Sequence, residues 1–174
     1  MSSGALAASA IGLTVGEREA VLAVTGINAS ALARSLTAKE RVRFRVWGVP
    51  HEQAPLWLPV VERSLVALYD LPPNWDTYGS PAIAQRALAA GVKILFSITS
   101  RDTAPPMIVP TSVGGIQLEW QSDVVDIEIN IAPDGQASLF MQHRNNGRVW
   151  EGALNEHEDY VRDFLRPLRP AVLS

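Results

Sequence analysis

The fold is decided by residues 107–154, MIVPTSVGGIQLEWQSDVVDIEINIAPDGQASLFMQHRNNGRVWEGAL, in which apolar and polar residues alternate. A period of two predicts strands that bury one face and expose the other. The alternating runs are separated by TSVGG, SD, PDG and NNG, which are typical of hairpin connections. This stretch therefore predicts an antiparallel β-meander of about five strands.

The turn sequences also predict a register. SD and NG fit two-residue turns, and APDG fits a type I turn closed by a glycine bulge. The resulting cross-strand pairs are Trp120 with Val125, Glu119 with Asp126, Ile129 with Leu139, His143 with Trp150, and Gln142 with Glu151. One face is then apolar and forms the predicted core: Ile116, Leu118, Trp120, Val125, Ile127, Ile129, Ile131, Leu139, Met141, Trp150 and Leu154.

The opposite face of the predicted sheet carries a row of Glu119, Asp126, Gln142 and Glu151. Like charges directly across a sheet cost a few tenths to about 1 kcal/mol. A functional interpretation is a cation site, an acid/base pair of an enzyme, or a surface for a basic partner. The alternative is a solvated face on which water and salt screen the repulsion, as is common in antiparallel sheets.

Before the meander, the sequence RVRFRVWGV (residues 41–49) also alternates and predicts a strand. Arg41, Arg43 and Arg45 lie together on one of its faces. These arginines can neutralise the acidic sheet face, contact phosphates or an acidic protein, or protect a strand edge from aggregation.

Helices are predicted both before and after the meander along the chain. One covers residues 60–71 after Pro59, with Val61, Leu65 and Leu68 inward. The next begins at Ser80 as N-cap, with Ile83, Ala87, Ile94 and Ile98 facing inward, and the last is capped by Asn155 and ends at Pro167. The predicted class is α+β with two layers, in which helices cover one face of the sheet.

Residues 1–40 are predicted to form a helical hairpin or a flexible arm, and residues 41–174 the α+β domain. Residues 1–16 are apolar but lack a basic segment and the length of a membrane span, so we expect a cytoplasmic protein that does not enter a membrane. Two short helices around the turn TGIN leave open a DNA-binding hairpin, against the simpler interpretation of a packing hairpin.

The connector LPPNWDTYGSP (residues 71–81) places two large aromatic residues between predicted helices. Trp75 and Tyr78 are interpreted first as wedges that close one end of the core, with their polar atoms toward water or Asp76. A ligand pocket lined by Trp75, Asp76 and Tyr78 is the alternative.

Composition excludes several chemistries. The chain has no cysteine, which removes disulfides, thiolate metal sites and cysteine nucleophiles. His51, His143 and His157 share no ligand spacing, and His143 is interpreted as structural because it falls on the core face. No catalytic, metal-binding or cofactor-binding motif occurs, so we expect no cofactor, and an enzyme is the less favoured class.

The segments NWDTYG (74–79), GGIQLEW (114–120) and DIEINIAPDG (126–135) resemble a family of small bacterial proteins with the patterns N-W-D-x-Y-G and G-G-x-Q-L-E-W, whose activity is uncharacterised. The resemblance covers about Leu71 to Leu154 and leaves out the N-terminal part. It implies an accessory or partner-binding protein rather than a metabolic enzyme.

The sequence as a whole predicts a non-enzymatic module that binds another protein, such as an antitoxin-like or regulatory accessory protein, with homo-oligomers left open. One alternative is nucleic-acid binding through the N-terminal hairpin and Arg41, Arg43 and Arg45, despite a net charge of −3. The other is a small enzyme or metal site on Glu119, Asp126 and Glu151.

Overall fold

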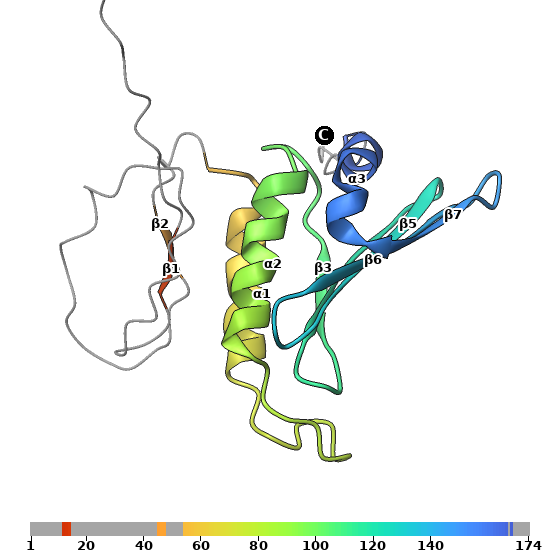
Figure 1. Ribbon diagram of the computed structural model, residues 1–174. Helices are drawn as coiled ribbons and strands as arrows, with labels where there is room; N and C mark the ends of the chain where they lie inside the picture. Colours follow the sequence, from red (N-terminus) through yellow and green to blue (C-terminus); the bar gives the residue numbers. More distant parts are fainter. Residues whose placement is uncertain (1–11, 15–44, 48–53, 167, 169–174) are drawn as a thin grey trace, which may run out of the picture. The chain divides into compact units, whose positions relative to one another are not determined.

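A computed structural model of the chain describes residues 12–14, 45–47, 54–166 and 168 (Figure 1). The chain divides into two compact units, Met1–Ala54 and Pro55–Ser174. In the first unit, strand β1 (Gly12–Thr14) pairs antiparallel with strand β2 (Arg45–Trp47), so that Leu13 faces Val46.

This division differs from the predicted boundary after residue 40. The first unit extends to Ala54 because β2, the described part of the predicted 41–49 strand, pairs with β1 and not with the meander. Strand β1 itself lies in the run 1–16, for which the sequence predicts a flexible or loosely docked start. The predicted helical hairpin, together with Arg41 and Arg43, lies outside the described residues.

The second unit contains the predicted meander, which is confirmed. Its strands are β3 (Met107–Pro110), β4 (Ile116–Gln121), β5 (Val125–Ile131), β6 (Ala137–His143) and β7 (Val149–Ala153). They form one antiparallel sheet in the order β3-β4-β5-β6-β7, so each strand pairs with the next one along the chain.

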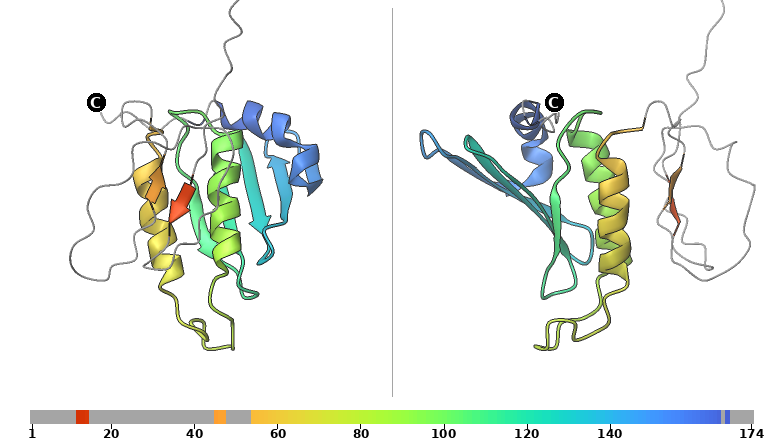
Figure 2. Two further views of the ribbon diagram at one scale, coloured as in Figure 1. Left: turned by 60° about the vertical axis from the view of Figure 1, so that its left-hand side comes forward. Right: turned by 180° about the vertical axis from the view of Figure 1, so that it is seen from behind.

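The helices α1 (Leu58–Tyr69), α2 (Gln85–Ile98) and α3 (Glu158–Leu165) lie on one side of this sheet (Figure 2). Helix α1 contacts β3, and α2 contacts β4, β5 and α3. A short 3₁₀ turn, η2 (Leu154–Glu156), leads from β7 into α3. The predicted α+β class with helices on one sheet face is therefore confirmed.

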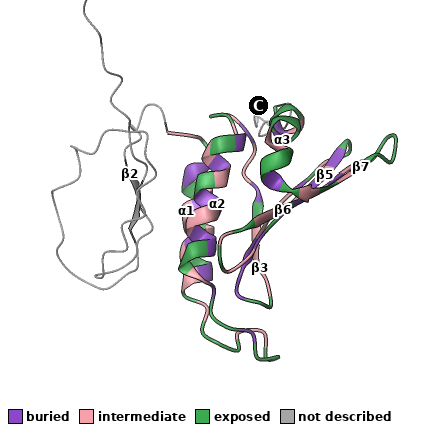
Figure 3. Ribbon diagram, viewed as in Figure 1, coloured by how far each residue is buried: buried purple, intermediate pink, exposed green. Residues whose placement is uncertain are grey.

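The core lies between the sheet and the helices (Figure 3). Ten of the eleven residues predicted for the core face of the sheet are buried. The eleventh, Trp150, is half-buried and packs against Phe164 of α3, with ring centroids 5.6 Å apart. From the helices, the predicted stripe of Val61, Leu65 and Leu68 is also buried.

Two predicted helix starts are wrong. Helix α2 begins at Gln85 and not at Ser80, because the Ala84 N–H donates to the Gly114 carbonyl (2.8 Å) and keeps Ala84 extended. Its buried face includes Leu88, Val92 and Leu95, whereas the predicted Ile94 is only half-buried. Helix α3 begins at Glu158, because the residues around the predicted cap Asn155 form η2.

The predicted register is correct for the hairpin between β5 and β6. It is wrong for the hairpins between β4 and β5 and between β6 and β7. Ile129 faces Leu139 as predicted. Between β4 and β5, however, Trp120 faces Ile127, because the turn is centred one residue later than SD. The Ser122 hydroxyl accepts the N–H groups of Val124 and Val125 (3.2 and 3.0 Å), which keeps Ser122 at the strand end.

The hairpin between β6 and β7 differs in the same way. His143 donates its N–H to the Arg148 carbonyl, and Gly147 donates to the His143 carbonyl, both at 2.8 Å. The turn therefore spans residues 144–147 in place of the predicted two-residue NG turn. Trp150 consequently faces Met141 and not His143, and Glu151 faces Phe140 and not Gln142.

Candidate protein-interaction surfaces

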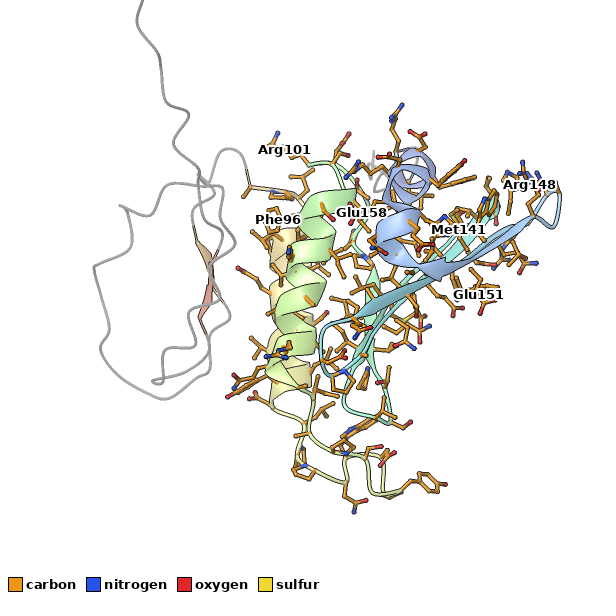
Figure 4. All side chains as sticks on the ribbon, in the orientation of Figure 1. Phe96, Arg101, Met141, Arg148, Glu151 and Glu158 are labelled. Carbon is orange, nitrogen blue, oxygen red and sulfur yellow. The ribbon has the colours of Figure 1, made fainter. Side chains whose placement is uncertain are left out.

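On the sheet face opposite the helices, a row of side chains rich in carboxylates crosses every strand of the meander. Its successive cross-strand neighbours are Met107, Glu119, Glu128, Phe140 and Glu151, which we call the outer row. Glu119 and Glu128 face each other directly on β4 and β5. Glu151 lies on the side of the sheet away from the helices (Figure 4).

The outer row replaces the predicted row of Glu119, Asp126, Gln142 and Glu151. Those four residues do share the outer face, but Asp126 lies between Gln121 and Gln142 in a neighbouring row. The register shift of two residues causes the difference. It leaves each side chain on the predicted face of the sheet and changes the residue that it faces on the next strand. Glu128, which sequence reasoning missed, therefore takes the place beside Glu119.

The carboxylates of this face are compensated unequally. Asp126 is paired with Arg144, with Nε–Oδ2 and Nη2–Oδ1 distances of 2.8 and 2.6 Å. The hydrogen bond and charge of Asp126 raise the pKa of Arg144. Glu128 accepts a hydrogen bond from Gln117 Nε2 at 3.0 Å. Within the described residues Glu119 and Glu151 make no ion pair, so the outer row keeps an uncompensated negative charge.

The outer face does not assemble a metal site from the described residues. Among these residues, no group of three or more His, Asp or Glu side chains is placed to hold a metal ion. The predicted set of Glu119, Asp126 and Glu151 is not brought together. Glu128 and Phe140 lie between Glu119 and Glu151, and Asp126 lies in the neighbouring row and pairs with Arg144.

The loop Asn74–Ser80 is held by its own polar groups. Its ends are joined by the Asn74 N–H, which donates to the Ser80 carbonyl at 2.6 Å. The Asn74 side-chain oxygen accepts the Gly79 N–H at 2.7 Å. The Asp76 carboxylate accepts the N–H groups of Tyr78 and Ser80 at 2.9 and 3.2 Å, and also the Ser80 hydroxyl.

These bonds explain two local features of the loop. The hydrogen bond from the Ser80 hydroxyl, followed by those from the backbone, lowers the pKa of Asp76. Asn74 and Thr77 have φ angles of 64° and 67°, in the left-handed region. Asn is tolerated there, but a β-branched residue such as Thr77 adopts this region rarely.

The prediction that Trp75 and Tyr78 are wedges is wrong for Tyr78. Trp75 is half-buried, and its Nε1–H is sealed from solvent without a hydrogen-bond partner among the described residues. Tyr78 is 91% exposed and closes no part of the core. The sequence therefore locates the loop correctly but assigns the wrong environment to Tyr78.

An aromatic cluster between β7 and α3 was not predicted from the sequence. Trp150 lies against Phe164 and Tyr160, with ring centroids 5.6 and 6.5 Å apart, and Arg148 stacks over Trp150 at 5.1 Å. His143 meets Phe164 edge-on at 5.9 Å, which agrees with its interpretation as a structural histidine. The available signal was the aromatic spacing Tyr160 and Phe164, one helical turn apart.

One residue of the predicted arginine surface, Arg45, lies in a described strand. Arg41 and Arg43 lie outside the described residues, and only the backbone of Arg45, in β2, is described. Nucleic-acid binding through these residues stays a prediction.

Comparisons of the chain with protein-family models, curated proteins and solved structures found no match. Among the described residues, no helix is long and apolar enough to cross a membrane. A functional interpretation therefore depends on the surfaces themselves.

Proposed function

We propose that this chain is a protein-binding module that docks a basic partner protein on the outer face of its sheet. The observation that supports the proposal is the outer row, in which Glu119 and Glu128 face each other and Glu151 follows beyond Phe140. Such a row costs stability in the free protein, by a few tenths to about 1 kcal/mol for a directly opposed pair. A partner's Lys or Arg side chains would offset that cost.

Apolar groups accompany the charges on this face. Met107, in the outer row, is 56% exposed, and Val149 on β7 is 50% exposed. Phe140, between two carboxylates of the row, is half-buried. A mixture of apolar contact area and uncompensated charge suits a partner protein, because the first contributes affinity and the second contributes orientation and association rate.

The sign of the charge also selects the partner class. Phosphates of a nucleic acid would be repelled by the carboxylates, and so would a second copy that presents the same face. A protein surface with Lys or Arg residues spaced along a strand or helix is complementary to this row.

The test uses two synthetic peptides of equal length as probes, one alternating Lys with Val and one alternating Glu with Val. We expect the full chain to bind only the basic peptide, with an affinity that falls as salt is added. The variant Glu119→Gln/Glu128→Gln/Glu151→Gln should bind it at least about tenfold more weakly, a change of about 1.4 kcal/mol. Titrations followed by fluorescence anisotropy measure both effects.

The matched control is Glu156→Gln, which removes an exposed carboxylate of η2 outside the outer row. It should bind the basic peptide as the unmodified chain does. The triple variant should melt at the same or a higher temperature, because the opposed charges are removed. Equal binding by the triple variant and the unmodified chain would refute the proposal.

A further inference from the structure

The connection between α1 and α2 is much longer than a helical hairpin needs. It runs from residue 70 to residue 84, whereas helices are usually joined by about two to eight residues. Its central part projects beyond the ends of both helices (Figures 1 and 2). Long connections without regular structure are uncommon in compact domains and are usually functional.

The shape of the projecting part is set by the loop itself. Asn74 and Asp76 accept or donate the hydrogen bonds that join its ends and brace its middle, as described above. A Cβ atom added at Gly79 would meet nothing within 4 Å, so packing against the body does not determine the backbone there. The tip of the loop, at Tyr78 and Gly79, is therefore held by polar bonds and not by packing against the body of the domain.

Thr77 is the residue for which this arrangement is costly. A β-branched residue at φ 67° is strained, and such strain persists only where surrounding bonds hold the backbone. Residues of this kind are concentrated at active sites, ligand clamps and switch regions. The strained residue directly precedes Tyr78, whose backbone N–H is fixed by Asp76.

The result of this arrangement is a fixed backbone that presents an unburied aromatic side chain. Tyr78 is 91% exposed, so it contributes little to the core. Tyrosine is enriched among the residues that dominate protein interfaces, since it offers a large contact area, one polar atom and few rotatable bonds. A prearranged loop also lowers the entropy lost on binding.

We propose that Asn74–Ser80 is a recognition loop whose Tyr78 enters a pocket on a partner protein. The pocket has apolar walls for the ring and a hydrogen-bonding group for the phenol. The inference rests on the proposed protein-binding function but names a different surface from the outer row. A protein is favoured over an anionic lipid surface because the Asp76 carboxylate lies two residues from Tyr78 and would be repelled by the headgroups.

The first stage of the test places a benzophenone amino acid at position 78 of the full chain, in cells that encode this protein. Control positions are Val113 and Tyr160, which are 63% and 54% exposed. We expect illumination to give one discrete protein adduct from position 78 and none from the controls. Adducts that are alike at all three positions, or absent from position 78, overturn the proposal.

In the second stage the adduct protein is identified, purified and titrated with variants of the full chain. Tyr78→Ala should bind at least about tenfold more weakly, and Tyr78→Phe should lose less, because it keeps the ring. Thr77→Gly should also bind more weakly while its melting temperature is unchanged or higher, since glycine relieves the strain but frees the loop. Unchanged binding by Tyr78→Ala overturns the proposal.

Two further measurements separate this inference from the outer row and from lipid binding. The outer-row triple variant is titrated with the same partner: a loss confined to Tyr78→Ala supports the loop even if the outer row proves inactive. The full chain is also sedimented with vesicles of three parts phosphatidylcholine and one part phosphatidylglycerol. Vesicle binding that depends on Tyr78, without a protein adduct, overturns the proposal.

Discussion

At the scale of single residues, Asp76 is the organising group of the exposed loop. Its carboxylate accepts the backbone N–H groups of Tyr78 and Ser80 and the Ser80 hydroxyl. Ser80 is buried, so this cluster also connects the loop to the body of the domain. The ionised form of Asp76 is the form that accepts these bonds, which makes the loop sensitive to acid.

The pKa of Asp76 is lowered below its ordinary value of 3.8, so the stability that its charge contributes is present above that value and lost as the pH falls through the folded-state pKa. We expect Asp76→Asn to lower the melting temperature at about pH 7, and the difference from the unmodified chain to shrink at about pH 2.5. Circular dichroism melts measure it, with Asp163→Asn, an exposed carboxylate of α3, as control. A difference that stays constant with pH would contradict this role.

The loop also shows what residue types alone do not predict. Aromatic residues are usually buried, so the sequence predicts wedges, and Trp75 is indeed half-buried. Tyr78 is instead exposed, in a loop in which Asn74 and Thr77 adopt positive φ angles. A left-handed threonine has no signature in the sequence, because the residue is disfavoured in that conformation and is held there by neighbouring bonds.

At the scale of elements, the face of each strand was predictable and its partner was not. Faces follow from the period of two, which a strand cannot change without turning its apolar residues to water. Partners depend on the centre of the turn, and moving it by one residue shifts the register by two. In the turn between β4 and β5, the Ser122 hydroxyl accepts the N–H groups of Val124 and Val125, and the turn is centred one residue later than predicted. Glu128 rather than Asp126 therefore lies beside Glu119.

Gly115, directly before β4, is required by close approach and not by its backbone angles. A Cβ atom at this position would lie 2.3 Å from the Ile131 carbonyl oxygen on β5. We expect Gly115→Ala to destabilise the domain by about 2–3 kcal/mol, because backbone atoms must separate to admit the methyl group. Urea unfolding measures the change.

Gly147→Ala is the control for Gly115→Ala. A Cβ atom there meets nothing within 4 Å, so only its positive φ of 67° opposes the substitution. Its cost should be smaller, at about 1 kcal/mol. Equal losses at the two glycines would show that the contact with Ile131 is not the cause.

At the scale of the whole molecule, the second compact unit has a core of its own, whose buried apolar residues lie between Trp57 and Leu165. We expect the fragment of residues 55–174 to fold alone and to unfold in one cooperative transition, because its sheet and helices bury their faces against each other. Calorimetry and near-ultraviolet circular dichroism measure this, with the full chain as reference. A broad transition without a near-ultraviolet signal would contradict it.

The class of the whole molecule was readable from the sequence because two periods divide the chain cleanly: 3.6 in the helices and two in the meander. The division into units was not readable in the same way. Residues 41–49 have the same alternation as the meander, and this periodicity does not identify the partner of a strand. The outer row depends on which strands pair and in which register, so the sequence predicted its face but not its members. The sequence likewise predicted the position of the Asn74–Ser80 loop but not the exposure of Tyr78.

The strand order of the sheet has a consequence for how the chain acquires its fold during synthesis. Because β3 to β7 pair in the order in which they are made, each hairpin closes a short loop and can form as soon as its second strand leaves the ribosome. Helices α1 and α2 emerge earlier, with their apolar stripes uncovered until β3, β4 and β5 are complete. The interval between the synthesis of Ile98 and that of Ile131 is therefore the period when the nascent chain most needs protection from aggregation.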